Sequence, residues 1–350
     1  MNRKRILGTG IVVVVLGLLV YLQVHAWKKF DWATFLKRTE DVNWSYIAVV
    51  VAIIYFLYVL RAVRWRMFLK PVHKTTTSRL LAPQFIGFAG LALLGRPGEM
   101  IRPYLVARQE QLTFSSQVAV WLVERIFDMG SVALLFVIEG FIGDPLWRRL
   151  GIRDLQVKVE WSAGLFLVVI VVLSVLAVLL RLSGERIAQY FECRIGRYST
   201  KVASAITSRI LAFTHGLETI SDFSSFVQLL LLSLVMWILA GVSYWLVLHS
   251  YGGTLAELGP ASIVLLMIAT MFGSLIQLPG VGGGSQLASI AVLNKVFGVQ
   301  NELAVSCGML LWLATFMSVI PMGLLLAHRE HVSLRAVAVE EQKAEAALKE

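Results

Sequence analysis

Long apolar segments alternate with short polar segments along most of the chain. Six of them consist mainly of aliphatic and aromatic residues: 6–24, 44–62, 117–142, 161–181, 226–249 and 302–327. A helix needs about 20 apolar residues to cross a hydrocarbon core about 30 Å thick. The pattern therefore predicts an all-α integral membrane protein with about six full spans.

Two further apolar stretches, 80–95 and 261–278, end at clusters of proline and glycine instead of ordinary loops. Shorter apolar stretches follow them, 103–107 after the first cluster and 285–297 after the second. Proline and glycine interrupt helices, and irregular backbone at membrane depth must lie against protein or water. We expect two re-entrant helical hairpins, each entering and leaving the membrane on one side. The alternative is that 261–278, with or without 80–95, crosses fully, which gives seven or eight ordinary spans.

The order of span, hairpin and span occurs twice, in residues 44–142 and again in 226–327. Counting the crossings places the two hairpins on opposite sides of the membrane, so that their tips meet near its midplane. This is the inverted-repeat plan of many transporters. We therefore expect residues 1–327 to form a single polytopic membrane domain, followed by a cytoplasmic tail at 328–350.

Composition and charge agree with a membrane protein and suggest its orientation. The chain is 57% hydrophobic, has a mean hydropathy of +0.74 and carries a formal net charge of +10, which excludes an ordinary soluble domain. Basic residues crowd the loops at 61–79 and 181–209, so these loops and both termini should face the cytoplasm of a cell (inner or plasma) membrane. Such patches attract anionic head groups, and we expect no nucleic-acid partner. The basic residues before 6–24 leave a signal peptide as the alternative for that segment.

The sequence contains no cofactor or metal motif. Cys193 and Cys307 form no CxxC pair, and the six histidines show no HExxH spacing. A phosphate-cradling GxxxxGK[ST] loop is missing as well, which argues against ATP hydrolysis by this chain. We expect no bound metal and no cofactor.

Charged residues interrupt the apolar pattern at the first proline and glycine cluster. In GRPGEMIR, Arg96 lies at the turn, while Glu99 and Arg102 are spaced to share one helical face. The apolar residues on both sides make full solvation awkward, so we expect these charges to lie in a polar cavity. The alternative is a surface loop with an ordinary ion pair.

Two other motifs place charges within or at the end of predicted spans. In WLVERIFDMG, Glu124 and Asp128 share one helical face and Arg125 lies beside them. Each charge at the centre of a membrane helix costs about 2.5–3.5 kcal/mol, so these three should pair or face water. They form a clamp between helices or a ligand contact, and both roles can coexist. In LRAVRWR, Arg61 and Arg64 either extend toward the interface or bind an anionic head group through bidentate contacts.

The second proline and glycine cluster, QLPGVGGGSQ, supplies backbone and amide groups without charge. Its candidate residues are Gln277, Pro279, Gly282, Gly283, Gly284 and Gln286. Glycines permit close approach of the backbone, and exposed amides at a helix start can hold an anion. The alternative is that the glycines pack tightly and the glutamines only join helices.

The motifs LRAVRW, LGRPGEMIRPYL, ERIFD and LPGVGGGSQ occur in the order seen in one known family. Over residues 6–327 the chain resembles the lysylphosphatidylglycerol synthase transmembrane domain, or flippase-like, family, also called the uncharacterised 0104 family. The family's motifs carry over onto Gly95, Arg96, Gly98, Glu99, Arg102, Glu124, Arg125 and Asp128. Many relatives place a glutamate after the glycines of the second tip, where this chain has Gln286, so a titrating carboxylate at that tip is not implied.

The resemblance implies the function of a membrane domain that moves lipids. In fused members, a soluble aminoacyl-transferase domain modifies the lipid that this kind of domain moves between leaflets. Only 23 residues, 328–350, follow the last predicted span, so the resemblance implies the transport half without the synthetic half.

The favoured hypothesis is a lipid translocase, or flippase, acting on an anionic phospholipid, an aminoacyl-phospholipid or a polyprenyl-phosphate-linked lipid. The arginines of the motifs would attract the head group, and the carboxylates would orient the arginines or exchange protons. A second hypothesis is a membrane-embedded transferase with Glu99 or Asp128 as general base. A third is a non-catalytic partner whose basic loops and tail dock a separate cytoplasmic or envelope enzyme.

Overall fold

A computed structural model describes residues 32–142, 223–275, 277–278 and 282–330, together with isolated helical positions between 168 and 211. The predicted span 6–24, the predicted span 161–181 apart from position 168, and the tail from 331 on lie outside the described residues. In the described part, four helical segments are long and apolar enough to cross a membrane: Trp44–Leu69, Thr77–Leu94, Ser224–His249 and Asn301–Arg329. The prediction of a helical membrane protein is confirmed at this level.

Three long helices occur where the hydrophobic pattern predicted them. They are α3 (Trp44–Leu69), α6 (Phe114–Ile142) and α10 (Phe223–His249). Asn43 caps α3, because its side-chain oxygen accepts a hydrogen bond from the Ser45 amide at 3.1 Å. The amide of Asn43 also donates to the Ser250 carbonyl at 2.9 Å, which joins the start of α3 to the end of α10. These two helices therefore run antiparallel.

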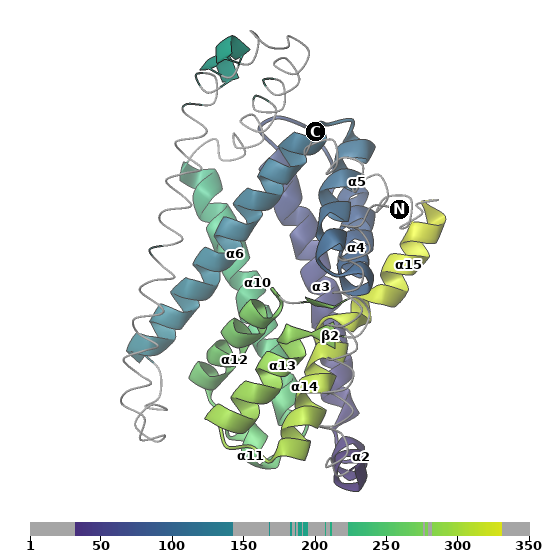
Figure 1. The fold of residues 1–350 in the computed structure, drawn as a ribbon, viewed down its shortest axis with the longest axis vertical. Coiled ribbons are helices and arrows are strands. Elements are labelled where there is room, and N and C mark those ends of the chain that lie inside the picture. Colours follow the sequence, from purple (N-terminus) through teal and green to yellow (C-terminus); the bar gives the residue numbers. More distant parts are fainter. Residues whose placement is uncertain are drawn as a thin grey trace, which may run out of the picture.

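The last predicted span is a broken helix. It consists of α14 (Asn301–Thr315), the single 3-10 turn η3 (Met317–Val319) and α15 (Ile320–Arg329). Pro321 lies in the first turn of α15, where a missing N–H costs no helical hydrogen bond. The break changes the direction of the chain, so that α15 packs along α4 instead of continuing the line of α14 (Figure 1).

The first proline and glycine cluster joins two antiparallel helices. α4 (Thr77–Leu94) ends at Gly95, whose φ of 73° favours glycine, and is followed by η1 (Arg96–Met100) and α5 (Ile101–Glu110). A Cβ added at Gly98 would meet the backbone carbonyl of Gly90, so the close contact at the turn requires glycine there.

The open end of this hairpin is held together by charged side chains. Glu110, at the end of α5, lies 3.0 Å from Arg79 Nε in the first turn of α4. It also lies 2.9 Å from His73 Nε2, in the loop that follows α3. The start of α4 and the end of α5 therefore lie at the same end of the bundle, near the end of α3.

The second cluster also joins two helices in a hairpin. α12 (Pro260–Gly273) is followed by two-residue strands, β1 (Gln277–Leu278) and β2 (Gly282–Gly283), which pair antiparallel. The chain continues as α13 (Gly284–Ala291) and a single π-helical turn, η2 (Val292–Val296). A Cβ at Gly273 would meet the carbonyl of Gly284, so glycine permits the close packing of α12 and α13.

The two hairpins open toward opposite ends of the molecule. In Figure 1, α4 and α5 occupy the upper half, α12 and α13 occupy the lower half, and β2 lies near the middle of the long axis. The short helices α11 (Gly253–Ala256) and α2 (Trp32–Glu40) lie at the lower end. This arrangement brings the two glycine-containing tips toward the same level of the bundle.

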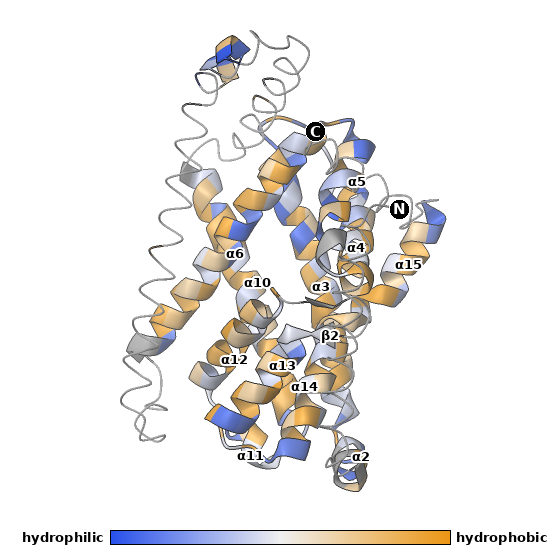
Figure 2. Cartoon of the chain, viewed as in Figure 1, coloured by the Kyte–Doolittle hydropathy of each residue, from blue (hydrophilic) through white to orange (hydrophobic). Residues whose placement is uncertain are grey.

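Apolar side chains form most of the helix surfaces and the packing between them. The largest buried cluster joins α3, α10 and α14, and a second joins the end of α3 to α6. Figure 2 shows orange apolar turns along the long helices, interrupted by blue polar turns within α3 and α6. These polar turns carry the charged motifs, and they face one another between the helices.

Candidate functional site

A buried carboxylate on α6 joins three helices. Glu124 is only 1% exposed, and its Oε1 lies 2.6 Å from Arg64 Nη2 of α3. Arg102 of α5 also donates to both carboxylate oxygens, through Nη1 to Oε1 at 3.1 Å and through Nη2 to Oε2. The Glu124 carboxylate therefore pairs with two arginines, Arg102 of α5 and Arg64 of α3. Such charge-assisted bonds are strong and directional.

Arg64 extends the same network to α10. Its Nη1 donates to Asp128 Oδ1 at 2.7 Å and to Ser233 Oγ at 2.9 Å. The indole N–H of Trp237 donates to the same Asp128 oxygen at 3.2 Å. Positions 124 and 128 lie one turn apart on α6, as do 233 and 237 on α10, so each helix presents two partners on one face. Arg64 is fully buried, and it does not extend to the interface.

Arg102 is fixed by aromatic rings as well as by Glu124. Its guanidinium carbon lies 4.6 Å from the Trp65 ring centroid and 5.0 Å from that of Phe88. The Trp65 N–H donates to Gln117 at 3.1 Å, which holds the ring in place. A guanidinium held against two aromatic faces gains cation–π attraction and loses rotational freedom. Arg102 is therefore a fixed part of the protein interior, only 3% exposed.

Arg125 lies beside this network and is one-third exposed. It approaches Asp128 Oδ2 at 3.3 Å and Glu99 Oε1 of the first hairpin tip at 3.8 Å. Its Nε is buried and has no hydrogen-bond partner among the described residues. These contacts are looser than those of Arg64 and Arg102, so Arg125 keeps donors for another group.

A cavity of about 250 Å³ lies between the two halves of the protein, with walls from α3, α4, α6, α10, α12, α13 and α14. Arg61, Arg125 and Asp128 contribute its charged side chains. The Arg61 guanidinium lies 4.8 Å from the Phe88 ring centroid. In the described part of the chain, Arg61 has no carboxylate within 4 Å and no hydrogen-bond partner.

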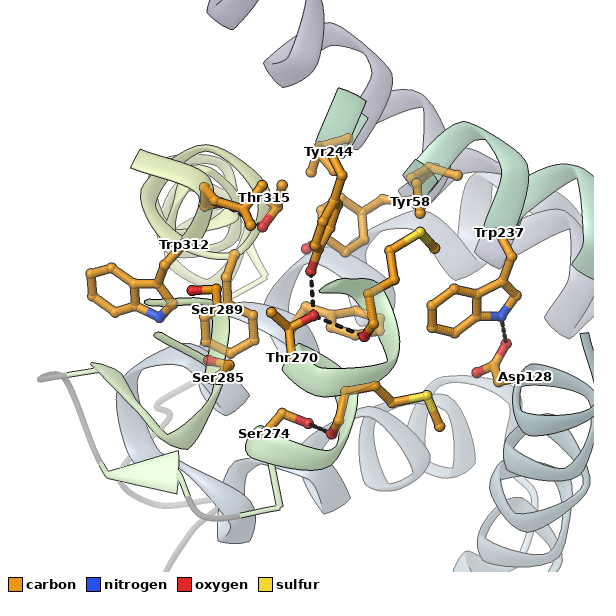
Figure 3. A pocket seen from close by; sticks show the side chains of 18 of the residues that line it. Tyr58, Asp128, Trp237, Tyr244, Thr270, Ser274, Ser285, Ser289, Trp312 and Thr315 are labelled. Carbon is orange, nitrogen blue, oxygen red and sulfur yellow. Dashed lines mark hydrogen bonds between the residues drawn. The ribbon is translucent and has the colours of Figure 1, made fainter. Parts of the chain in front are cut away.

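The opposite wall of the cavity carries uncharged polar groups. Figure 3 shows Asp128 and Trp237 on one side of the cavity and Trp312 on the other, with Tyr244 and Thr270 between them. The other hydroxyl groups on this wall come from Ser274, Ser285, Ser289 and Thr315, and Tyr58 of α3 adds one more to the lining. The cavity therefore combines cations on one wall with hydroxyls on the other, within a mostly apolar bundle.

The structure divides the candidate residues into two groups. The buried ion-pair network contains Arg64, Arg102 and Glu124. The cavity is lined by Arg61, Arg125 and Asp128. Arg102, which was expected to share a helical face with Glu99, binds Glu124 on α6. The ion-paired clamp and the cavity-lining arginines therefore lie side by side.

The second tip is described in part. Gly283 caps α13, Gly284 begins it, and Gln286 lies in its first turn close to the cavity residue Ser285. Pro279 lies outside the described residues, and so do the side chains of Gln277 and Arg96. Gly282 is described only as a strand position. Any binding role at this tip remains a prediction.

Sequence reasoning missed the contribution of α10. Ser233, Trp237 and Tyr244 repeat at intervals of four and seven, which places them on one helical face. This polar stripe in an otherwise apolar segment was a visible signal. Gln84 of α4 accepts a hydrogen bond from Arg102 at 3.2 Å. A single glutamine in an apolar segment was a weaker sequence signal.

In the described residues, no group of three or more His, Cys, Asp and Glu side chains is placed to hold a metal ion. The site is instead a network of arginines and carboxylates beside a cavity. Such an arrangement can bind and orient an anion through charge-assisted hydrogen bonds.

Comparison with known proteins gives two matches. The model of the family described as "Lysylphosphatidylglycerol synthase TM region" matches residues 6–323. The chain is also similar to a UPF0104 membrane protein of Methanothermobacter thermautotrophicus, with 23% identity over 295 residues that cover 82% of this chain and 84% of the relative. No solved structure matches.

Proposed function

The chain belongs to the lysylphosphatidylglycerol synthase transmembrane family, and we propose that it moves a phosphate-bearing lipid between the leaflets of a membrane. The head group would pass through the cavity between the two hairpins while the tails stay in the bilayer. The observation that carries this proposal is the excess of positive charge at the cavity. An anion is the ligand that this excess favours.

The charge balance rests on the described contacts. Four arginines, at 61, 64, 102 and 125, lie near three carboxylates, at 99, 124 and 128. The buried network pairs its own charges, so the uncompensated cation is Arg61, on the cavity wall. An unpaired charge deep in a membrane protein costs about 2.5–3.5 kcal/mol, and a bound phosphate would offset that cost. Arginine is suited to this role because its planar fork matches phosphate oxygens.

We further propose that both hairpins re-enter the membrane from opposite sides, in an inverted repeat. The support is the bundle geometry: Arg79 and Glu110 hold the ends of the first hairpin together, and the second hairpin opens toward the other end (Figure 1). Irregular backbone at both tips then lies beside a polar cavity, where it is tolerated. By the positive-inside rule, the first hairpin would open to the cytoplasm.

Cysteine labelling from one side tests this topology. Single cysteines are introduced at the exposed positions Lys74, Gln111, Glu257 and Gln300, in a protein whose Cys193 and Cys307 are replaced by serine. An impermeant reagent should label the first two positions from one side and the last two from the other. Labelling of positions 74 and 111 from opposite sides would contradict a re-entrant first hairpin, because the chain between them would then cross the membrane once.

Transport is tested in reconstituted vesicles with an acyl-chain-labelled anionic phospholipid. Protein should speed exchange between leaflets, and Arg61→Gln should slow it about tenfold or more, because one charge-assisted bond contributes about 1.5–3 kcal/mol. Arg66→Gln is the matched control, since Arg66 lies on the same helix but is exposed. Exchange that is no faster with protein than without it would refute the proposed function.

A further inference from the structure

Most hydroxyl groups of the cavity wall already donate their hydrogens to other protein groups. Thr270 donates to the Met267 carbonyl at 2.9 Å, and Ser274 donates to the Met271 carbonyl at 2.6 Å. Because the Thr270 hydrogen is used, the Tyr244 hydroxyl, 2.8 Å away, must donate to Thr270 (Figure 3). A hydroxyl has one hydrogen and two lone pairs, so these groups present only lone pairs to the cavity.

Two other hydroxyls of this wall follow the same rule. Ser289 donates to the Gln286 carbonyl at 2.8 Å, and Thr315 donates to the Leu311 carbonyl at 2.7 Å. Such bonds to the preceding helical turn are common for serine and threonine in apolar helices. These hydroxyls therefore act as hydrogen-bond acceptors toward the cavity, and Ser285 is the wall hydroxyl whose hydrogen has no acceptor among the described residues.

One donor on the same wall has no partner. The indole Nε1 of Trp312 is buried, and no described residue accepts its hydrogen. Figure 3 draws this nitrogen on the side of the ring that faces Ser289. A buried N–H without a partner is costly, so a ligand that accepts here gains affinity. The wall as a whole is therefore complementary to a ligand group that both donates and accepts hydrogen bonds, as a hydroxyl group does.

The cavity offers no free carboxylate to a cationic head group. Asp128 is the one acidic residue in its described lining. Asp128 Oδ1 accepts from Arg64 and Trp237, and Oδ2 faces Arg125 at 3.3 Å. From Pro260 to Asn301, the sequence that supplies the hydroxyl-bearing hairpin contains no aspartate or glutamate. An ammonium group would therefore meet Arg61 and Arg125 without a counter-charge.

We propose that the head group is the phosphate ester of a small neutral polyol, a class that includes glycerol phosphate. This inference rests on the proposed function and specifies its substrate. The phosphate lies against Arg61 and Arg125, while the polyol hydroxyls donate to the hydroxyl wall and accept from Trp312. The cavity of about 250 Å³ is slightly smaller than the roughly 300–1,000 Å³ that holds drug-sized ligands, so it fits a small polyol and not an oligosaccharide.

Binding of tail-less head groups tests the proposal without requiring transport. Thermal unfolding of the purified full chain in detergent is followed against glycerol 3-phosphate, inorganic phosphate, phosphoethanolamine and phosphocholine. Glycerol 3-phosphate should stabilise the protein at a concentration about tenfold lower than inorganic phosphate does, because it adds two or more hydrogen bonds. Equal half-maximal concentrations for all four compounds, or a preference for either ammonium-bearing compound, would overturn the proposal.

Two variants assign the preference to the hydroxyl wall. Trp312→Phe removes the unpartnered donor and keeps the ring, and Ser274→Ala removes one acceptor. Each should bring the half-maximal concentrations of glycerol 3-phosphate and phosphate at least threefold closer together, while phosphate binding alone changes less than twofold. Trp245→Phe is the control, because Trp245 is exposed and lies outside the cavity lining. An unchanged ratio in Trp312→Phe would count against the hydroxyl wall.

The same measurements separate this inference from the proposed function. If glycerol 3-phosphate is preferred but no lipid crosses vesicles faster with protein, the head-group assignment stands and translocation is wrong. If anionic lipids cross faster but glycerol, ethanolamine and choline head groups cross at equal rates, translocation stands and the polyol assignment is wrong.

Discussion

Neutralising Glu124 should destabilise the protein strongly, because two buried arginines depend on this carboxylate. Glu124→Gln keeps the shape of the side chain and removes its charge. One oxygen becomes an NH₂ group, which faces the N–H groups of Arg64 or Arg102 instead of accepting from them. Neither arginine can move to water, since Arg64 is fully buried and Arg102 nearly so.

The expected magnitude follows from this burial. Removing one partner of a buried ion pair costs about 3–5 kcal/mol, because the other charge stays uncompensated. Arg64 keeps Asp128 at 2.7 Å, whereas Arg102 keeps, among the described residues, only Gln84 and two aromatic rings. Most of the cost should therefore fall on Arg102. At about 2 °C per kcal/mol for a chain of this size, the apparent melting temperature should fall by about 6–10 °C.

The assay is thermal unfolding in detergent, followed by the fraction of protein that remains monodisperse. Glu139→Gln is the matched control, because Glu139 lies on the same helix and forms no hydrogen bond or ion pair with another described residue. The double variant Glu124→Met with Arg102→Met should lose less stability than the sum of the single changes, by about 2 kcal/mol. A Glu124→Gln protein that melts within about 1 °C of the original would refute the reasoning, since the carboxylate would then compensate no buried charge.

Three other changes test the packing and the network. Gly98→Ala should destabilise the first hairpin by about 1–3 kcal/mol, because the new methyl group meets the carbonyl of Gly90; Gly259→Ala, where nothing lies within 4 Å, is the control in the same melting assay. Arg64→Lys should cost about 2 kcal/mol, because an ammonium cannot span Glu124 and Asp128 as the guanidinium fork does, and a melting temperature equal to that of the original would contradict this. Trp237→Phe should cost about 1 kcal/mol through one lost hydrogen bond. A larger loss of stability than that of Arg64→Lys would contradict the expectation that the Arg64 ion pairs contribute more than the Trp237 hydrogen bond.

The network and the cavity share one helix, so stability and binding are linked at this site. Asp128 holds Arg64 through Oδ1 and faces Arg125 through Oδ2, with the cavity beside it. Changes at Glu124 should therefore act first on stability, whereas changes at Arg61 should act first on binding. Because Arg61 lies outside the buried ion pairs, a change in transport caused by Arg61→Gln should report on head-group binding and not on protein stability.

The sequence by itself determined the helices and the positions of their charges. Apolar runs of sufficient length predicted α3, α6 and α10 within a few residues, because burial of a helix in lipid requires an apolar surface along its whole length. Proline and glycine clusters predicted where the two hairpins turn, since these residues end helices and permit close backbone contact.

Only the tertiary structure decided which charge meets which. Arg64 and Arg61 are one turn apart at the end of the same apolar run, yet Arg64 is enclosed by two carboxylates and Arg61 faces a cavity. The hydroxyl wall likewise comes from residues on α10, α12, α13 and α14 that are far apart in the sequence. Helical periodicity fixes the face of a residue on its own helix, but the partner across that face depends on how the helices pack against one another.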